Sequence, residues 1–190
     1  YFIDIFPETW NIAIEKLESK LKIAKKKKKL PKLIIVVHLG GLPVNPIKLK
    51  SLSRKYKFKI VEDASHSLGA KYCSRRVGCS KWSDITVFSF HPVKNIAMPT
   101  GGLISINHQN HKQFRKILLA RRWCGITDRI DSEYDVKELG WNYYMNEFSA
   151  AIGLAQLKKL DRLNNIRKNI AKFYDKQIDV EHKTAFNKDC

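Results

Sequence analysis

Two short stretches decide the fold of this chain: Lys57-Phe-Lys-Ile-Val-Glu-Asp63 and Thr86-Val-Phe-Ser-Phe-His-Pro-Val-Lys94. Each contains a short apolar run typical of a buried strand. The first run ends on an acid, and the second is followed by a lysine. If the two strands lie in one parallel sheet, their carboxyl ends meet at the same edge, where open α/β sheets bind ligands. A carboxylate and a lysine would then face one pocket.

The residues before these stretches predict a βαβ unit. Residues 11–28 have the apolar spacing of an amphipathic helix, and residues 32–37 form an apolar run typical of a buried strand. A helix over 46–56 and a strand over 58–62 complete the series. Strand, helix and strand in this order predict neighbouring parallel strands. The first residues of the chain also resemble part of a strand.

The rest of the chain predicts further elements of the same α/β fold. Glycine and polar residues make 69–83 a hairpin or loop, whereas 125–140 has no strong period and is expected to be a long loop. Residues 146–176 have a helical pattern throughout, longer than a usual globular helix. The other expected elements are strands over 86–90 and 102–106 and a helix over 111–123.

Composition argues against a membrane-spanning protein, a disulfide-rich scaffold and a metal protein. With 190 residues, of which 44% are hydrophobic, the chain can form a real core. No apolar run is long enough to predict a membrane span. The four cysteines have neither metal-site spacing nor disulfide density, so we expect no metal and a reducing cytoplasmic setting.

The formal net charge of +18 raises the alternative of nucleic-acid binding. The lysines, however, are scattered over every segment, and no nucleic-acid-binding motif accompanies them. The one run, Lys25 to Lys29, follows a predicted helix, where lysines are favoured by the helix dipole and solvated. A charged surface turn is therefore expected there, and nucleic acid is an unlikely partner.

The pairing of Asp63 with Lys94 has a specific chemical use. Pyridoxal phosphate needs a lysine amine to hold its aldehyde and an acid to keep its ring nitrogen protonated. Four segments around the pair give this interpretation its specificity. They are residues 62–70, residues 88–94, Gly101-Gly102 and residues 139–157. In content, order and spacing they resemble the DegT/DnrJ/StrS family of sugar aminotransferases.

The resemblance implies a fold and a domain organisation. The fold would be an α/β, fold-type-I pyridoxal-phosphate-dependent transferase of the aspartate aminotransferase type, with a mostly parallel sheet flanked by helices. Residues 1–165 would be the central and carboxy-terminal part of the large domain, and 166–190 the end of a linking helix and the start of the small domain. Family members are longer, so the chain is expected to be a fragment and the fold incomplete.

The resemblance also assigns roles to five residues. Lys94 would bind the cofactor and move the proton, and Asp63 would pair with the ring nitrogen. His66 would hydrogen-bond the phenolic oxygen and Ser89 the phosphate, while Asn142 would reach the phosphate of a neighbouring subunit. The active sites would then be shared in a homodimer. The structural alternatives are a helix cap or a strand-end turn for Asp63, a core position for His66 and a buried-strand position for Ser89.

The implied activity is transfer of an amino group, from glutamate, to a nucleotide-linked keto-sugar in surface polysaccharide or glycoprotein biosynthesis. Pro7-Glu-Thr-Trp-Asn-Ile and His91-Pro-Val-Lys94 are most similar to members that aminate the 4-keto position of UDP-linked 6-deoxy sugars, as in pseudaminic acid pathways. Lysine at position 94 favours amine exchange over hydroxyl removal, since dehydrating members have histidine there.

Two stretches depart from the family pattern. Met98-Pro-Thr-Gly-Gly102 stands where the family has Thr-Gly-Glu-Gly-Gly, and Tyr144 follows Asn142-Tyr where the family has arginine. These departures leave a rival hypothesis open. In that hypothesis the chain is a non-catalytic remnant of the fold that binds nucleic acid or another polyanion through its basic surface.

Overall fold

The computed structural model describes residues 1–79 and 81–178, and the elements below belong to these residues. The first half of the chain alternates helices with parallel strands, as the sequence predicts. The helices are α1 (Ile14–Lys26), α2 (Pro46–Tyr56), α3 (His111–Arg122), α4 (Glu147–Leu157) and α5 (Leu160–Gln177), with a short 3-10 turn at Leu39–Gly41. The strands are β1 (Leu33–Val37), β2 (Lys59–Asp63), β3 (Lys71–Tyr72), β4 (Arg75–Arg76), β5 (Ile85–Ser89), β6 (Gly102–Ile106), β7 (Ile126–Ile130) and β8 (Glu133–Val136).

A four-stranded sheet in the order β1-β2-β5-β6 forms the centre of the molecule. β1, β2 and β5 are parallel, and β6 is antiparallel to β5. In the register, Val37 is opposite Asp63, and Asp63 is opposite Val87. The parallel strands therefore end at one edge, which confirms the prediction that the segments after β2 and β5 begin at the same edge of the sheet.

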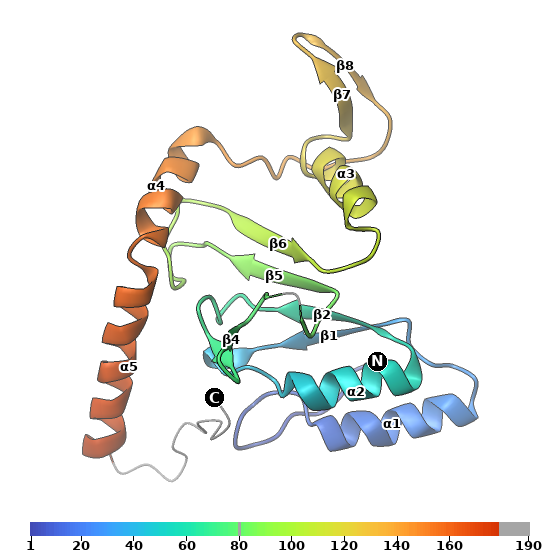
Figure 1. Ribbon diagram of the computed structural model, residues 1–190, viewed down its shortest axis with the longest axis vertical. Helices are drawn as coiled ribbons and strands as arrows, with labels where there is room; N and C mark the ends of the chain where they lie inside the picture. Colours follow the sequence, from blue (N-terminus) through green and yellow to red (C-terminus); the bar gives the residue numbers. More distant parts are fainter. Residues whose placement is uncertain (80, 179–190) are drawn as a thin grey trace.

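The helices α1 and α2 cover one face of the sheet (Figure 1). Local sequence defines α2 well: Pro46 occupies its first turn, and the Asn45 side chain accepts a hydrogen bond from Lys48 N at 3.0 Å. Alternate strand residues point to this face. Residues in or directly before α1, β1, α2 and β2 form the core: Ile14, Leu17, Leu21, Val36, Val44, Leu49, Leu52, Tyr56, Phe58 and Ile60.

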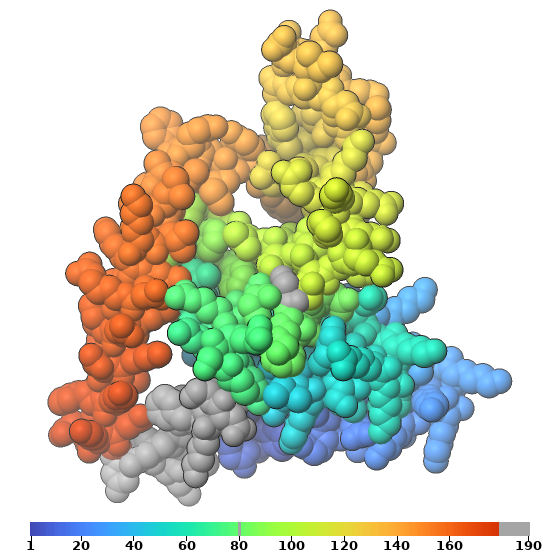
Figure 2. All heavy atoms as spheres, in the orientation of Figure 1, coloured from blue at the N-terminus to red at the C-terminus, as the bar shows by residue number. Residues whose placement is uncertain are grey.

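The helices α4 and α5 follow one another along one side of the sheet, and the β7–β8 hairpin projects away from it (Figure 1). The space-filling view shows the same division, because the yellow segment of α3 and the hairpin rises above the blue and green body (Figure 2). The lysine run at the end of α1 is exposed, as predicted.

The structure corrects three expectations about secondary structure. The 125–140 segment is not a loop, since it forms the β7–β8 hairpin. The helix expected over 146–176 is two helices, because Lys158 and Lys159 separate α4 from α5. The first residues form no strand, and Ile5 makes only an isolated bridge to Ile12. In each case tertiary packing, or its absence, overrides local propensity.

The proposed domain division remains a prediction. Its boundary at 165/166 falls inside α5, and residues 179–190 lie outside the described residues.

Candidate active site

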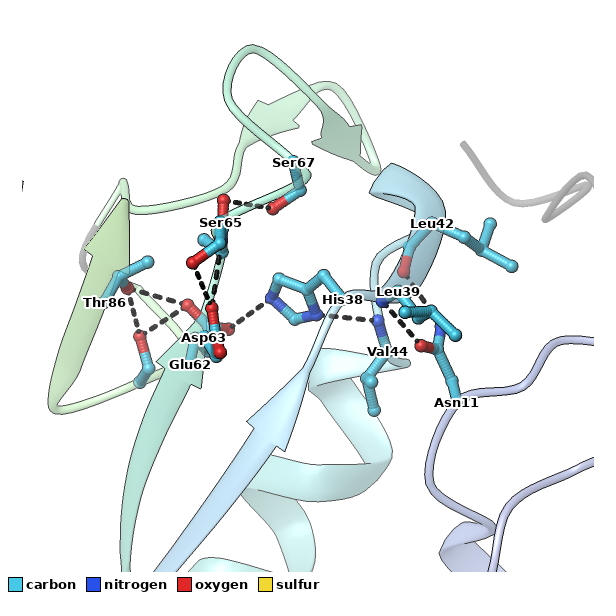
Figure 3. Close-up of polar contacts among 12 residues, drawn as sticks. Asn11, His38, Leu39, Leu42, Val44, Glu62, Asp63, Ser65, Ser67 and Thr86 are labelled. Carbon is cyan, nitrogen blue, oxygen red and sulfur yellow. Dashed lines mark hydrogen bonds and ion pairs between the residues drawn. The ribbon is translucent and has the colours of Figure 1, made fainter. Parts of the chain in front are cut away.

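Asp63 ends β2 and lies at the carboxyl edge of the sheet. Its Oδ1 accepts hydrogen bonds from the backbone N of Ser65 at 3.0 Å and from Ser65 Oγ at 2.6 Å (Figure 3). His38 N donates to the carbonyl oxygen of Asp63 at 3.0 Å. No described residue contacts Oδ2 through a hydrogen bond or ion pair. Asp63 therefore closes a turn with one oxygen and leaves the other available to a ligand.

The neighbouring residue, Glu62, points to the opposite face and is buried. Its Oε2 accepts hydrogen bonds from Ser83 Oγ and Thr86 Oγ1, both at 2.8 Å. His38 Nδ1 accepts a hydrogen bond from Val44 N at 3.1 Å, so the ring proton lies on Nε2, 3.6 Å from Glu62 Oε1 (Figure 3). Glu62 thus forms a buried network with Ser83 and Thr86, and the His38 ring faces its other oxygen without a hydrogen bond.

The pKa of Glu62 reflects this network. Burial acts to raise the pKa of the carboxyl group, but the facing His38 ring and the hydroxyl groups of Thr86 and Ser83 together hold it below its usual value. Glu62 is therefore a carboxylate at neutral pH. Its partners all lie within the protein, so its role is to fix the end of β2.

Lys94 lies on the segment that follows β5. This segment is closed by backbone hydrogen bonds from Phe90 N to Gly101 O and from Met98 N to Phe90 O, both 3.0 Å. Lys94 N donates to His91 O at 2.9 Å, and the residue is half-buried. No described residue forms a hydrogen bond or ion pair with Lys94 Nζ. Hydrogen bonds thus hold the backbone of this segment, and its lysine amine has no carboxylate partner among the described residues.

His66 and Ser89 lie near the same edge. His66 is exposed, so it is not a core histidine, and its Nδ1 accepts a hydrogen bond from Gly40 N at 3.3 Å. The acceptor role of Nδ1 leaves the proton on Nε2 as a donor. Ser89 is the last residue of β5, and its Oγ accepts a hydrogen bond from His91 N at 3.3 Å. Its hydroxyl proton remains available for a ligand oxygen.

Asn142 lies elsewhere in the chain. It is exposed on the segment between β8 and α4 and forms a bridge with Trp123, at the end of α3. Asp63 and Ser89 therefore end neighbouring parallel strands, His66 and Lys94 lie on the segments that follow these strands, and Asn142 lies on a different segment. Tyr144, which stands where the family has arginine, has a hydrogen-bond partner nearby: its hydroxyl group donates to Glu147 Oε1 at 2.7 Å.

The donor set at the edge fits pyridoxal phosphate. It offers an amine without an ionic partner for the aldehyde, a carboxylate oxygen for the ring nitrogen, an imidazole N–H for the phenolic oxygen and a hydroxyl group for the phosphate. Among the described residues, no group of three or more histidine, cysteine, aspartate or glutamate side chains is placed to hold a metal ion.

Two residues that the sequence does not predict belong next to this set: Asn95, which follows Lys94, and Asn164, which accepts a hydrogen bond from Asn95 at 2.9 Å. A polar residue in the middle of a helix has the pattern of a solvent-facing side chain. No signal in a single sequence distinguishes Asn164 from its exposed neighbour Asn165.

Known proteins resemble this chain over nearly its whole length. The model of the DegT/DnrJ/EryC1/StrS aminotransferase family matches residues 1–188. A UDP-4-amino-4,6-dideoxy-N-acetyl-beta-L-altrosamine transaminase from Campylobacter jejuni is 38% identical over 181 residues, which are 95% of this chain and 46% of that protein.

Solved structures have the same fold. PseC from Helicobacter pylori, an aminotransferase involved in the biosynthesis of pseudoaminic acid, has a TM-score of 0.80 at 28% identity, over 97% of this chain and 49% of its own. The PLP-form of a putative sugar aminotransferase, Spr1654 from Streptococcus pneumoniae, has a TM-score of 0.78 at 26% identity, over 93% of this chain and 47% of its own. The chain thus spans about half the length of these relatives.

These matches confirm the resemblance and the fold class, a mostly parallel sheet flanked by helices that covers part of the complete fold. The chain belongs to the DegT/DnrJ/EryC1/StrS aminotransferase family.

Proposed function

We propose that this chain carries the lysine-bearing part of a pyridoxal-phosphate-dependent aminotransferase. The single observation that carries the proposal is the position of Lys94. This half-buried lysine has no ionic partner among the described residues, and it follows β5, whose parallel neighbour β2 ends at Asp63. The family match and the donor set support it. The rival hypothesis of a polyanion-binding remnant is not favoured, because a remnant needs neither side chain.

The proposed substrate is a keto-sugar linked to a nucleotide, with glutamate as the amino donor. The Campylobacter jejuni relative is named for a UDP-linked 4-amino-4,6-dideoxy sugar, which supports amination at the 4-position of a UDP-linked 6-deoxy sugar. Such sugars would serve surface polysaccharide or glycoprotein biosynthesis. The excess of lysine also suits an anionic substrate, because a positive field raises its local concentration.

Each residue of the set has a separate task in this chemistry. When bound, pyridoxal phosphate supplies an aldehyde that exchanges amines and a protonated ring that accepts electrons. Lys94 would hold the cofactor through its amine and would move the proton at the substrate carbon. Asp63 would keep the ring nitrogen protonated, and the Nε2–H of His66 would donate to the phenolic oxygen. Ser89 would donate its hydroxyl proton to the phosphate without adding charge.

We further propose that the protein acts as a homodimer with shared sites. Asn142 lies apart from the other four residues and would serve the site of a second copy. The segment around it supports this, since Trp141 and Tyr143 are exposed and α4 exposes Phe148 and Leu154. Such apolar groups are normally covered by a partner.

A cytoplasmic location is the setting in which we expect this chemistry. Cys79 and Cys124 are exposed with free thiols, as is usual in a reducing compartment. Among the described residues, no helix has the length and apolar character needed to cross a membrane.

Replacement of Lys94 tests the proposed function. Pyridoxal phosphate is added to the protein, and the visible spectrum is recorded before and after glutamate. We expect a visible band that glutamate changes, and we expect Lys94→Ala to lose the band and to slow amine transfer at least roughly 100-fold, since proton transfer contributes 10²–10⁴-fold. The exposed Lys71→Ala is the matched control and should behave as the unchanged protein.

Two outcomes would overturn the proposal. One is a band that persists unchanged in Lys94→Ala. The other is a folded protein that gives no band and instead binds nucleic acid with a steep salt dependence, which would support the polyanion-binding hypothesis.

A further inference from the structure

One side chain of α5 contacts both segments that carry the proposed chemistry. Asn164 Oδ1 accepts a hydrogen bond from Asn95 Nδ2 at 2.9 Å, and Asn164 Nδ2 donates to the carbonyl oxygen of Leu68 at 3.1 Å. Asn95 directly follows Lys94. Leu68 lies two residues after His66, on the segment that follows β2, in the turn closed by the hydrogen bond from Ala70 N to Ser67 O. Asn164 therefore bridges the segments after β5 and β2.

The surroundings of Asn164 fix it in this place. A Cβ atom on Gly69 would lie 2.5 Å from Asn164 Nδ2, so the backbone of the segment after β2 packs directly against the amide. Leu160, one turn earlier on α5, is 4% exposed and lies under the same glycine. Arg167 Nη1 adds a weaker hydrogen bond to Asn95 O at 3.4 Å. The half-buried amide is thus held from both sides.

We propose that Asn164 is a positioning residue that sets the distance between Lys94 and the segment of Asp63 and His66. The inference rests on the proposed function for its meaning, although the contacts do not depend on it. A primary amide suits the task, since it donates on one side and accepts on the other without bringing a charge near Lys94. Because α5 carries the bridge, the continuation of the chain beyond the sheet also supports the site.

The first test measures the protein without cofactor. Two amides report on the two segments: Ala70 N, bonded to Ser67 O, and Lys94 N, bonded to His91 O, both at 2.9 Å. We expect Asn164→Ala to accelerate hydrogen exchange at both amides by about tenfold, as the loss of one net hydrogen bond per segment would do. Exchange in α1 and β1 should not change.

Two control variants separate this role from general support of the helix. Asn165→Ala changes the same residue type at an exposed neighbouring position, so it carries the same gain in helix propensity. Asp161→Ala removes the ion pair from Asp161 to Arg76, which anchors α5 to the β3–β4 hairpin at 3.0 Å but touches neither segment. Neither control should accelerate exchange at Ala70 or Lys94.

A second comparison tests the bridge itself. In an Asn95→Ala background the bond to Asn164 is already absent, so adding Asn164→Ala should change exchange at Lys94 by less than about twofold, the result expected of coupled residues. Exchange at Ala70 should still rise. Equal, additive increases at Lys94 in both backgrounds would overturn the inference, as would unchanged exchange in Asn164→Ala.

The last readout links the bridge to the cofactor. Pyridoxal phosphate that has bonded to Lys94 is fixed by borohydride reduction and counted by mass spectrometry. Asn164→Ala should slow this labelling about tenfold, in proportion to the loosened segments, whereas Asn165→Ala should not. If the unchanged protein is not labelled, the proposed function fails, and the exchange data still decide the bridge. If it is labelled and Asn164→Ala is labelled equally fast, the positioning role fails alone.

Discussion

The region from α1 to β2 and the region from β6 to α5 differ in how they are stabilised. The first contains the hydrophobic core, in which Leu49 is 2% exposed and Ile60 is 1% exposed. In the second, α4 leaves Phe148 85% exposed and Leu154 64% exposed. In the first region α1 and α2 bury their apolar side chains against the sheet, although β1 exposes Leu33, Ile35 and Val37. In the second region the exposed apolar groups lie on a helix, α4, where such groups are normally covered by a partner.

The helices of the two regions differ in the same way. α1 and α2 each bury one stripe and expose lysines on the other side. α4 is apolar around most of its circumference, which is the pattern of a helix enclosed by other elements. The contrast supports the proposal that a partner covers the second region rather than the first.

The largest effect should come from a core leucine. Leu49→Ala should destabilise the protein by about 2–5 kcal/mol, because it removes buried methyl groups and leaves a cavity. The matched change in the second region, Leu154→Ala, should cost less than about 0.5 kcal/mol in the monomer, as is usual for surface changes. Urea unfolding followed by circular dichroism at low protein concentration measures both. Equal losses would contradict the division into two regions.

The buried carboxylate of the first region should give the next largest effect. Glu62→Gln keeps the shape of the side chain but weakens the bonds from Ser83 and Thr86, and should cost about 2 kcal/mol at pH 7, the range of hydrogen bonds to charged groups. Its pKa is lowered from 4.5 in the folded protein, so its stabilisation is present above pH 4.5 and is lost as the pH falls through the folded value.

The measurement is urea unfolding at pH 7 and at several values below pH 4.5. The gap between the original protein and Glu62→Gln should narrow as the pH falls. Glu15→Gln is the control, since Glu15 is exposed and should change the unfolding midpoint little at any pH. A gap that stays constant down to acid pH would show that the Glu62 charge does not stabilise the fold.

The two regions also differ in how much of their structure the sequence predicts. In the first region, the spacing of apolar residues follows the side chains that are buried, and proline marks the start of a helix. Proline at the start of α2 and the apolar runs of β1 and β2 therefore predicted the elements, with bounds within one residue for the strands. Asp63 and Lys94 could be placed at one edge because parallel strands share their carboxyl ends.

In the second region the sequence signal was weak for a physical reason. All four residues of β8 are exposed, so no alternation of buried and exposed residues marks the hairpin, and its turn uses Asp131 at a positive φ of 50°. The break before Leu160 has neither proline nor glycine. It accompanies the packing of Leu160 under Gly69, which is 91 positions earlier in the sequence and could not be predicted from local pattern.

A glycine of the second region should affect global stability less than Leu49 or Glu62, although its local strain is severe. Gly125 has a φ of +76°, and a Cβ atom there would lie 1.8 Å from the carbonyl oxygen of Glu138. Two backbone segments cross at this point, so Gly125→Ala should separate the base of the β7–β8 hairpin.

Because the hairpin is largely exposed, its release should lower the free energy of unfolding by less than about 1 kcal/mol, while amide exchange in β7 and β8 accelerates strongly. Gly40→Ala controls for the positive φ alone: Gly40 has a φ of +61° and open space around its Cβ position. It should leave exchange in the hairpin unchanged. If Gly125→Ala instead unfolded α1 and β1 together with the hairpin, the two regions would form one cooperative unit, and the exposed apolar surface of α4 would have to be reinterpreted as part of the folding core.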